Sequence, residues 1–91
     1  MTKSELIKAI ASKMEMPNQE AEVAVNTVFD TMSASLEQGN RVELRGFGSF
    51  GLKARRARVG RNPKNGAQVQ VDAKRVLFFK AGLELRKRVD V

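Results

Sequence analysis

The sequence predicts an α+β protein. It is expected to have an N-terminal helical hairpin, a three-stranded antiparallel sheet with a long protruding β-ribbon arm, and a short C-terminal helix. Three observations predict this fold. Apolar residues recur at helical spacing through residues 1–40 and then alternate with a period of two. Segment 53–75 holds eight Lys or Arg and one acid around the turn signal Asn62-Pro63-Lys64-Asn65-Gly66, which is typical of a basic hairpin.

The first two elements are predicted to be helices. Thr2 and Glu5 have the spacing of a capping box, with Thr2 as the N-cap of the first helix. Pro17 ends that helix, and Asn18 is the expected N-cap of the second. The pair Gly39-Asn40 is expected to end the second helix.

The remaining elements follow from the change of period. Residues 41–45 alternate apolar and charged side chains, as in a strand with one wet face. The Gly-Phe-Gly at 46–48 is expected to be a tight turn, in which the glycines allow positive φ and Phe47 between them plugs the core. The strand that returns from the arm ends in the apolar run 76–79, and a short basic helix, 81–89, closes the chain.

Length, charge and residue usage limit the possible functions. The 91 residues allow one domain, 1–91, with a net charge of +7 that is −3 over residues 1–40 and +10 over 41–91. Such a charge attracts nucleic acid or an anionic membrane, and no apolar run is long enough to favour the membrane. Cysteine and histidine are absent, so no catalytic residue, metal site, cofactor or small-molecule substrate is expected. The N-terminus lacks signal-peptide features, which predicts a cytoplasmic protein.

The basic arm needs a partner, because it has little to bury and many like charges. A two-stranded basic ribbon with an apolar tip suits duplex DNA. An RNA-binding or ribosome-associated basic protein is the alternative, although the arm lacks the aromatic side chains that RNA modules use for stacking. An enzyme is the third possibility, and neither a nucleophile–histidine pair nor a phosphate-binding glycine loop supports it.

Association with a second chain is also expected. Only about 68 residues, 1–52 and 76–91, remain outside the arm to build a body. Their apolar residues exceed what one small core would bury, so these segments are predicted to form a dimerisation body. The predicted dimer-core residues are Phe29, Phe47, Phe50 and Phe79.

Three motifs, in order along the whole chain, resemble the HU/IHF family of bacterial DNA-bending proteins. They are Arg45-Gly46-Phe47-Gly48-Ser49-Phe50, then Gly60-Arg61-Asn62-Pro63-Lys64 with Gly66, and Phe79-Lys80 with Gly82 and Leu85. The resemblance implies an intertwined dimer in the bacterial nucleoid, whose two arms wrap into the minor groove while a proline at each tip kinks the duplex. Segment 41–45 is most similar to the β-subunit branch of integration host factor. The dimer could be a homodimer or a heterodimer with a related subunit.

The expected contacts follow from this resemblance and from the chemistry of the side chains. Pro63 is the expected DNA-intercalating wedge, against the simpler interpretation of a turn former. The expected minor-groove residues are Arg55, Arg58, Arg61 and Asn62. The expected phosphate contacts are Lys3, Lys53, Arg56, Lys64, Lys74, Arg75, Lys80 and Arg86. Glu43 and Arg45 either contribute a site preference or form an ion-pair cluster with Arg41.

Overall fold

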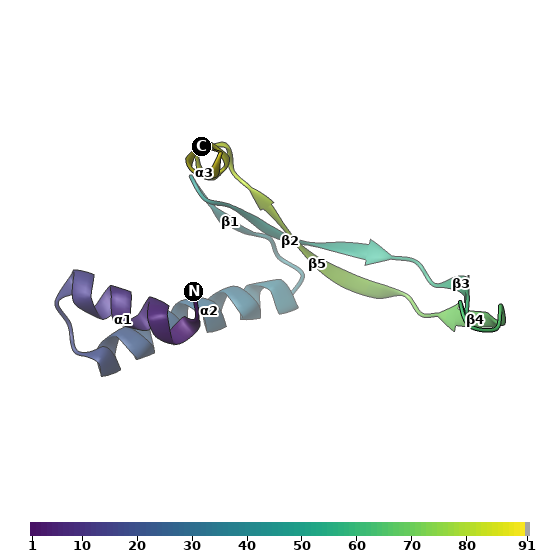
Figure 1. Ribbon diagram of the computed structural model, residues 1–91, viewed down its shortest axis with the longest axis horizontal. Coiled ribbons are helices and arrows are strands. Elements are labelled where there is room, and N and C mark those ends of the chain that lie inside the picture. Colours follow the sequence, from purple (N-terminus) through teal and green to yellow (C-terminus); the bar gives the residue numbers. More distant parts are fainter. Residues whose placement is uncertain (91) are drawn as a thin grey trace.

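The computed structural model describes residues 1–90 and has the predicted α+β fold (Figure 1). The elements are α1 (Lys3–Met14), α2 (Asn18–Glu37), β1 (Val42–Leu44), β2 (Gly48–Arg55), β3 (Arg58–Arg61), β4 (Gln68–Val71), β5 (Lys74–Ala81) and α3 (Leu83–Val89). The helical hairpin lies at one end of the molecule, and the sheet crosses above the C-terminal half of α2 (Figure 1).

The cap of α1 was predicted correctly, whereas the cap of α2 was not. The Glu5 backbone N–H donates to Thr2 Oγ1 at 3.2 Å, as expected for an N-cap. Asn18 is instead the first residue inside α2, and Pro17 occupies the N-cap position without a side-chain hydrogen bond. The carbonyl of Pro17 accepts the N–H groups of Glu20 and Ala21, each at 3.1 Å. A capping side chain is therefore not needed to start this helix.

Only one of the two glycines at the turn between β1 and β2 has a positive φ. Gly46 has a φ of +83°, as predicted, but Gly48 belongs to β2 and does not have a positive φ. A Cβ on Gly48 would lie 2.6 Å from both the Lys80 carbonyl oxygen and Phe79 Cζ. Glycine is therefore required at position 48 by the close approach of β5, and the conformation of the turn does not require it.

Strand register gives the three-stranded sheet, ordered β1-β2-β5, two different faces. Its apolar face consists of Val42, Leu44, Phe50, Leu52, Leu77 and Phe79. This face looks toward α2, because Leu52 and Leu77 line the same hollow as Ser33 and Leu36 of that helix. The opposite face, called the basic face, carries Lys53, Arg55, Lys74 and Lys80.

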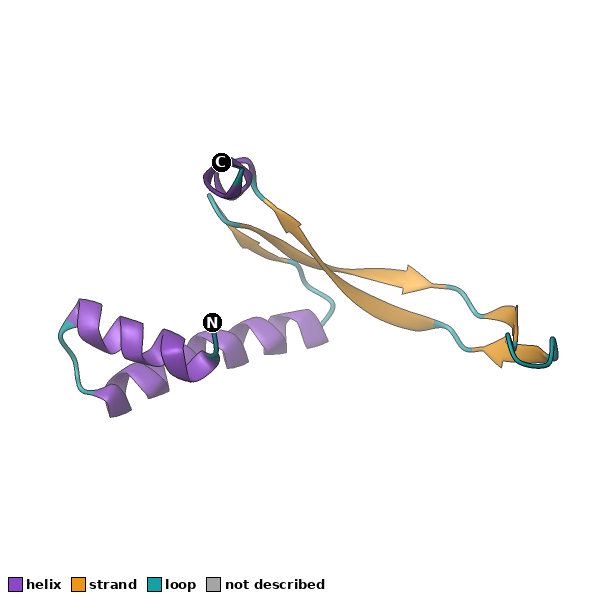
Figure 2. Ribbon diagram, in the orientation of Figure 1, coloured by secondary structure: helices purple, strands orange, loops and turns teal. Residues whose placement is uncertain are grey.

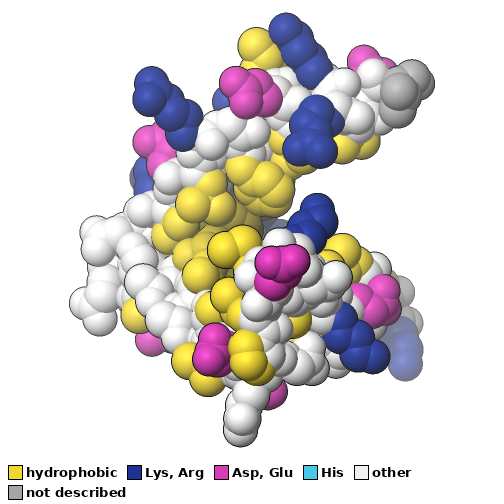
Figure 3. Space-filling view, turned by 90° about the vertical axis from the view of Figure 1, so that its left-hand side faces the viewer, with side chains coloured by type: hydrophobic (Ala, Val, Ile, Leu, Met, Phe, Trp, Pro, Cys, Tyr) yellow, Lys and Arg dark blue, Asp and Glu magenta, His cyan; other side chains and the backbone are white. Residues whose placement is uncertain are grey.

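The folded chain leaves much of its apolar surface uncovered. Among residues 1–90 the buried hydrophobic side chains are Ile7, Ala21 and Val25, all within the helical hairpin. The accessible surface is 7965 Å², whereas a compact monomer of 10.1 kDa would expose roughly 5,300 Å². The radius of gyration is 18.9 Å, against about 12 Å for a compact domain of this length. Apolar side chains line the open hollow between hairpin and sheet (Figure 3).

The arm, called the ribbon and defined as residues 53–75, is built from two separate ladders. Pairing of β2 with β5 ends at Arg55 opposite Lys74, and pairing resumes between β3 and β4 at Arg58 opposite Val71. The residues between the ladders are not in strands. The ribbon projects away from both helices of the hairpin (Figure 2), and the longest dimension of the molecule is 58 Å. The predicted hairpin is thus present but interrupted.

Candidate nucleic-acid interface

The cations of the ribbon have no acidic partner among residues 1–90. All eight are exposed: Lys53, Arg55, Arg56, Arg58, Arg61, Lys64, Lys74 and Arg75. Among residues 1–90 the only ion pair joins Arg41 Nη2 to Glu43 Oε1 at 3.3 Å, outside the ribbon. The positive charge of the ribbon therefore acts on the solvent and on any polyanion that approaches it.

The basic face continues from the sheet into the root of the ribbon. Arg55 stands opposite Lys74 in the ladder, and Lys80 stands opposite Ser49 on the same face. Lys53 lies between them, with its Nζ 5.0 Å from the ring centre of Phe78. The ammonium group of Lys53 therefore lies over the face of an aromatic ring, in a cation–π contact, while the side chain stays exposed.

The distal ladder carries an arginine on each face. Arg58 is paired with Val71, and Arg61 is paired with Gln68. Arg61 follows Arg58 by three positions, an odd spacing, so the two side chains point to opposite faces of the ribbon. A ribbon with this arrangement can offer a guanidinium to a surface on either side.

The tip of the ribbon is held by its own hydrogen bonds. Asn62 Oδ1 accepts the Lys64 N–H at 2.9 Å, and Asn65 Oδ1 accepts the Ala67 N–H at 2.9 Å. Two backbone bonds close the loop: Asn62 N–H donates to the Ala67 carbonyl, and the Gly66 N–H donates to the Asn62 carbonyl, each at 2.8 Å. These bonds hold the loop around the exposed ring of Pro63. Asn62 Oδ1 already accepts one hydrogen bond within the turn, so the two N–H donors of its Nδ2 are the groups best placed to meet a partner.

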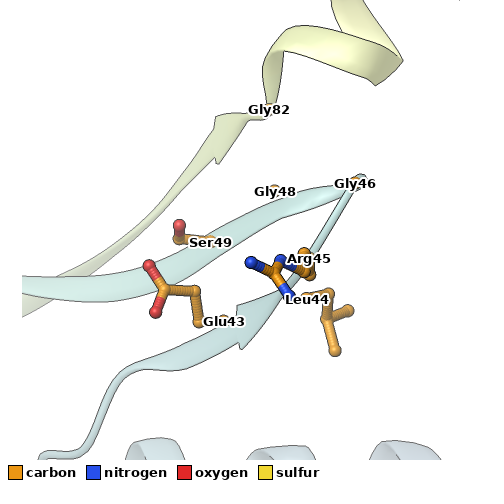
Figure 4. A pocket seen from close by; sticks show the side chains of 7 residues that line it. All are labelled: Glu43, Leu44, Arg45, Gly46, Gly48, Ser49 and Gly82. Carbon is orange, nitrogen blue, oxygen red and sulfur yellow. The ribbon is translucent and has the colours of Figure 1, made fainter.

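A hollow at the β1–β2 end of the sheet brings together Glu43, Leu44, Arg45, Gly46, Gly48, Ser49 and Gly82 (Figure 4). Glu43 is paired with Arg41, and both side chains are about 70% exposed, at 73% and 69%. An ion pair this exposed stabilises a fold by about 1 kcal/mol at most. The ion-pair alternative is thus realised for Arg41 and Glu43, while Arg45 has no ion-pair partner among residues 1–90.

Five predicted phosphate contacts lie outside the basic face: Arg56 between the two ladders, Lys64 at the tip, and Lys3, Arg75 and Arg86 elsewhere. Lys3 is exposed, and its Nζ donates to Asn26 Oδ1 at 2.9 Å. Arg86 is exposed on α3. Arg75 points toward α2, where its Nη2 donates to the Glu37 carbonyl at 3.3 Å. Alternation along the strand predicts that Lys74 and Arg75 point to opposite faces of the sheet. The position of α2 shows that Arg75 lies on the face that contacts this helix.

The phenylalanines predicted for the dimer core form a partly exposed cluster. Phe79 lies 4.7 Å from Phe50 and 5.6 Å from Phe47, measured between ring centres. Phe29, Phe47 and Phe79 remain 42%, 46% and 42% exposed. Phe47 therefore does not plug the core within one chain, and its place in the core of a dimer stays a prediction. Large aromatic side chains left this exposed form an apolar surface suited to association.

The chain combines an α+β body with a basic ribbon whose cations have no acidic partner among residues 1–90. These features place it in the class of proteins that bind nucleic acid mainly through charge. Within residues 1–90, no helix is long and apolar enough to cross a membrane. The family model described as bacterial DNA-binding protein matches residues 1–90. The chain belongs to this HU/IHF family, whose members are architectural DNA-binding proteins.

Individual relatives agree with the family match. The chain is 56% identical to integration host factor subunit beta of Burkholderia mallei over 91 residues, covering 99% of this chain and 85% of the relative. The same values hold for the subunit beta of Burkholderia thailandensis.

Solved structures show the same fold. An Anabaena HU–DNA cocrystal structure matches with a TM-score of 0.88 at 37% identity, covering 98% of this chain and 97% of that one. HU from Thermotoga maritima matches with a TM-score of 0.68 at 27% identity, covering 98% of each chain.

Proposed function

We propose that this chain works as one half of a dimer that bends duplex DNA. The two ribbons bind in the minor groove, and Pro63 at each tip inserts between base pairs. The observation that carries the proposal is the exposed Pro63 ring on a tip whose shape is held by internal hydrogen bonds. A rigid apolar ring can fill the gap of an unstacked base step. The Anabaena HU with which the chain shares its fold was crystallised with DNA.

The side chains of the ribbon and the sheet divide into two proposed roles. Arginine is favoured in narrow, electronegative minor grooves, so the proposed groove residues are Arg55, Arg58, Arg61 and Asn62. The proposed phosphate contacts are Lys3, Lys53, Arg56, Lys64, Lys74, Lys80 and Arg86. Binding then rests on charge and DNA deformability, with Glu43 and Arg45 adding a site preference. The proposed location is the bacterial nucleoid in the cytoplasm.

The proposed partner subunit covers the apolar body formed by residues 1–52 and 76–91. The chain exposes about 2,700 Å² more than a compact monomer of its mass, the difference between 7965 Å² and roughly 5,300 Å². The ribbon contributes to this excess, and so do apolar side chains of the body such as Phe29, Phe47 and Phe79, which are 42%, 46% and 42% exposed. The name of the Burkholderia relatives, subunit beta, favours a related but different partner chain.

Replacing Pro63 tests the wedge. Pro63→Ala keeps every cation, so it should still bind straight duplex DNA. It should bend DNA less and lose its preference for nicked duplexes, because alanine fills an unstacked step poorly and recovers less of the unstacking cost of a few kcal/mol. The bend angle is measured by energy transfer between the duplex ends, alongside affinity for intact and nicked duplexes.

Lys64→Ala is the matched control at the neighbouring position. It should weaken binding and make the salt dependence shallower by about 0.9 for each phosphate that is no longer neutralised, while leaving the bend of the saturated complex intact. Unchanged bending and unchanged nick preference in Pro63→Ala would reduce Pro63 to a turn residue and leave bending to the cations.

A further inference from the structure

Arg75 differs from the other ribbon cations because it donates a hydrogen bond to a helix of the body. It is paired with Ala54 in the ladder and so points away from the basic face that carries Lys74. Its Nη2 donates to the Glu37 carbonyl at 3.3 Å, across 38 positions of sequence. Its Nη1 lies 3.7 Å from the place where a Cβ of Gly39 would be. The guanidinium therefore sits on the end of α2.

The end of α2 lacks a cation of its own. The last four carbonyls of a helix have no partner within the helix and carry the negative end of its dipole. The N–H groups of residues 38, 39 and 40 satisfy the carbonyls of Ala34, Leu36 and Ser35. The last turn contains no basic residue. The Glu37 carbonyl receives its hydrogen bond, and the helix end its positive charge, from Arg75.

The contact lies at the root of the ribbon. Arg75 is adjacent to Lys74, where the β2–β5 ladder ends. Around the guanidinium, Ser33, Leu36, Glu37, Leu52 and Leu77 line a hollow between α2 and the sheet. A two-stranded ribbon has no core beneath it to set its direction. A hydrogen bond from its root to the end of a 20-residue helix supplies a fixed point.

We propose that Arg75 is a positioning residue: by binding the C-terminal end of α2, it sets the angle at which the ribbon leaves the body. This inference rests on the proposed bending function and assigns Arg75 a role other than phosphate contact. Without the hydrogen bond to α2, the ribbons keep the rest of their cations and still bind DNA. Their tips then meet the duplex over a wider range of angles, and a smaller share of complexes carries the full bend.

Two substitutions that remove the same charge from opposite faces test this role. Arg75→Met keeps the length of the side chain and should leave the slope of log affinity against log salt unchanged. In saturated complexes it should lower the mean bend angle and broaden its distribution. Lys74→Met is the control: it should make the slope shallower by about 0.9 for each phosphate that is no longer neutralised, and leave the bend intact.

Amide exchange links the effect to the helix. Exchange of the Gly39 and Asn40 N–H groups should accelerate in Arg75→Met and stay unchanged in Lys74→Met. Arg75→Lys keeps a charge near the helix end, so it should fold even if the methionine variant does not. Its bend distribution should fall between those of the wild type and the methionine variant, or match that of the wild type.

Two outcomes would overturn the inference. A shallower salt slope with unchanged bending in Arg75→Met would make Arg75 a phosphate contact. Wild-type bending and wild-type exchange in that variant would leave Arg75 without a role. If the methionine variant does not fold, Arg75→Gln removes the same charge in its place, and a shallower slope with unchanged bending in that variant would likewise contradict positioning. Failure of the wild-type protein to bend DNA would instead overturn the proposed function, and amide exchange would still test the hydrogen bond at α2.

Discussion

The body and the ribbon both present surfaces that suit a partner, but of opposite kinds. The body exposes aromatic and aliphatic groups such as Phe29, Phe47 and Phe79, with Ile7 and Val25 among its few buried side chains. The ribbon exposes eight cations and one acid. Apolar surface is covered by another apolar surface, whereas like charges are neutralised by a polyanion. The two regions therefore call for two different partners, a protein chain and a nucleic acid.

The largest expected effect concerns the ribbon and salt. If the two ribbons of a dimer neutralise about eight phosphates, log affinity should fall with log salt at a slope near −7, about 10⁴-fold between 50 and 200 mM. Fluorescence anisotropy across a salt series measures it. Lys8→Gln, which removes an exposed cation of α1, should leave the slope unchanged. A slope shallower than about −3 would mean that the ribbon charges do not meet the DNA backbone.

The second effect belongs to the body. Phe79→Ala removes a ring from the apolar face and should weaken dimerisation by about 3–5 kcal/mol, the usual cost of such a truncation at a buried site. Phe78→Ala, one position away on the basic face, is the control and should leave the monomer–dimer equilibrium unchanged. Analytical ultracentrifugation over a range of chain concentrations measures both. Equal effects of the two substitutions would remove the distinction between the faces.

Glycine substitutions in the body and in the ribbon should differ in their effect on the folding stability of the protein. Gly48→Ala forces a Cβ to within 2.6 Å of the Lys80 carbonyl oxygen and should cost about 1–3 kcal/mol of folding stability. Gly66→Ala meets open space but a φ of +72°, so it strains only the tip, by roughly 1–2 kcal/mol. Melting at one fixed chain concentration should show a lower Tm for Gly48→Ala alone. A comparable drop for Gly66→Ala would show that the ribbon folds cooperatively with the body.

The smallest expected effect compares two local caps. Thr2→Ala removes the N-cap of α1 and should lower global stability by about 1 kcal/mol. Asn62→Ala removes an equivalent side-chain bond to a backbone N–H at the ribbon tip. It should leave the Tm unchanged and accelerate exchange of the Lys64 amide. A loss of Tm in Asn62→Ala as large as that in Thr2→Ala would contradict the independence of the two regions.

Local signals predicted the elements because each depends on residues close together in sequence. The Thr2 cap, the end of α2 near Gly39 and the turn around Pro63 are all decided within a few residues. The Asn18 cap was wrong because the carbonyl of the preceding proline already begins the helix. Element ends commonly shift by a residue in this way.

The sequence by itself determined the charge separation, the two helices, the alternating strands and the tip of the ribbon. Only the tertiary structure decided which face of each strand meets which neighbour. Phe78 and Phe79 are adjacent and alike, yet one lies beneath Lys53 and the other joins the Phe50 cluster. Lys74 and Arg75 are adjacent cations, yet only Arg75 reaches α2. Alternation of side chains along a strand depends only on neighbouring residues. The docking of α2 against one face of the sheet brings together residues 38 positions apart, and no short sequence pattern encodes that contact.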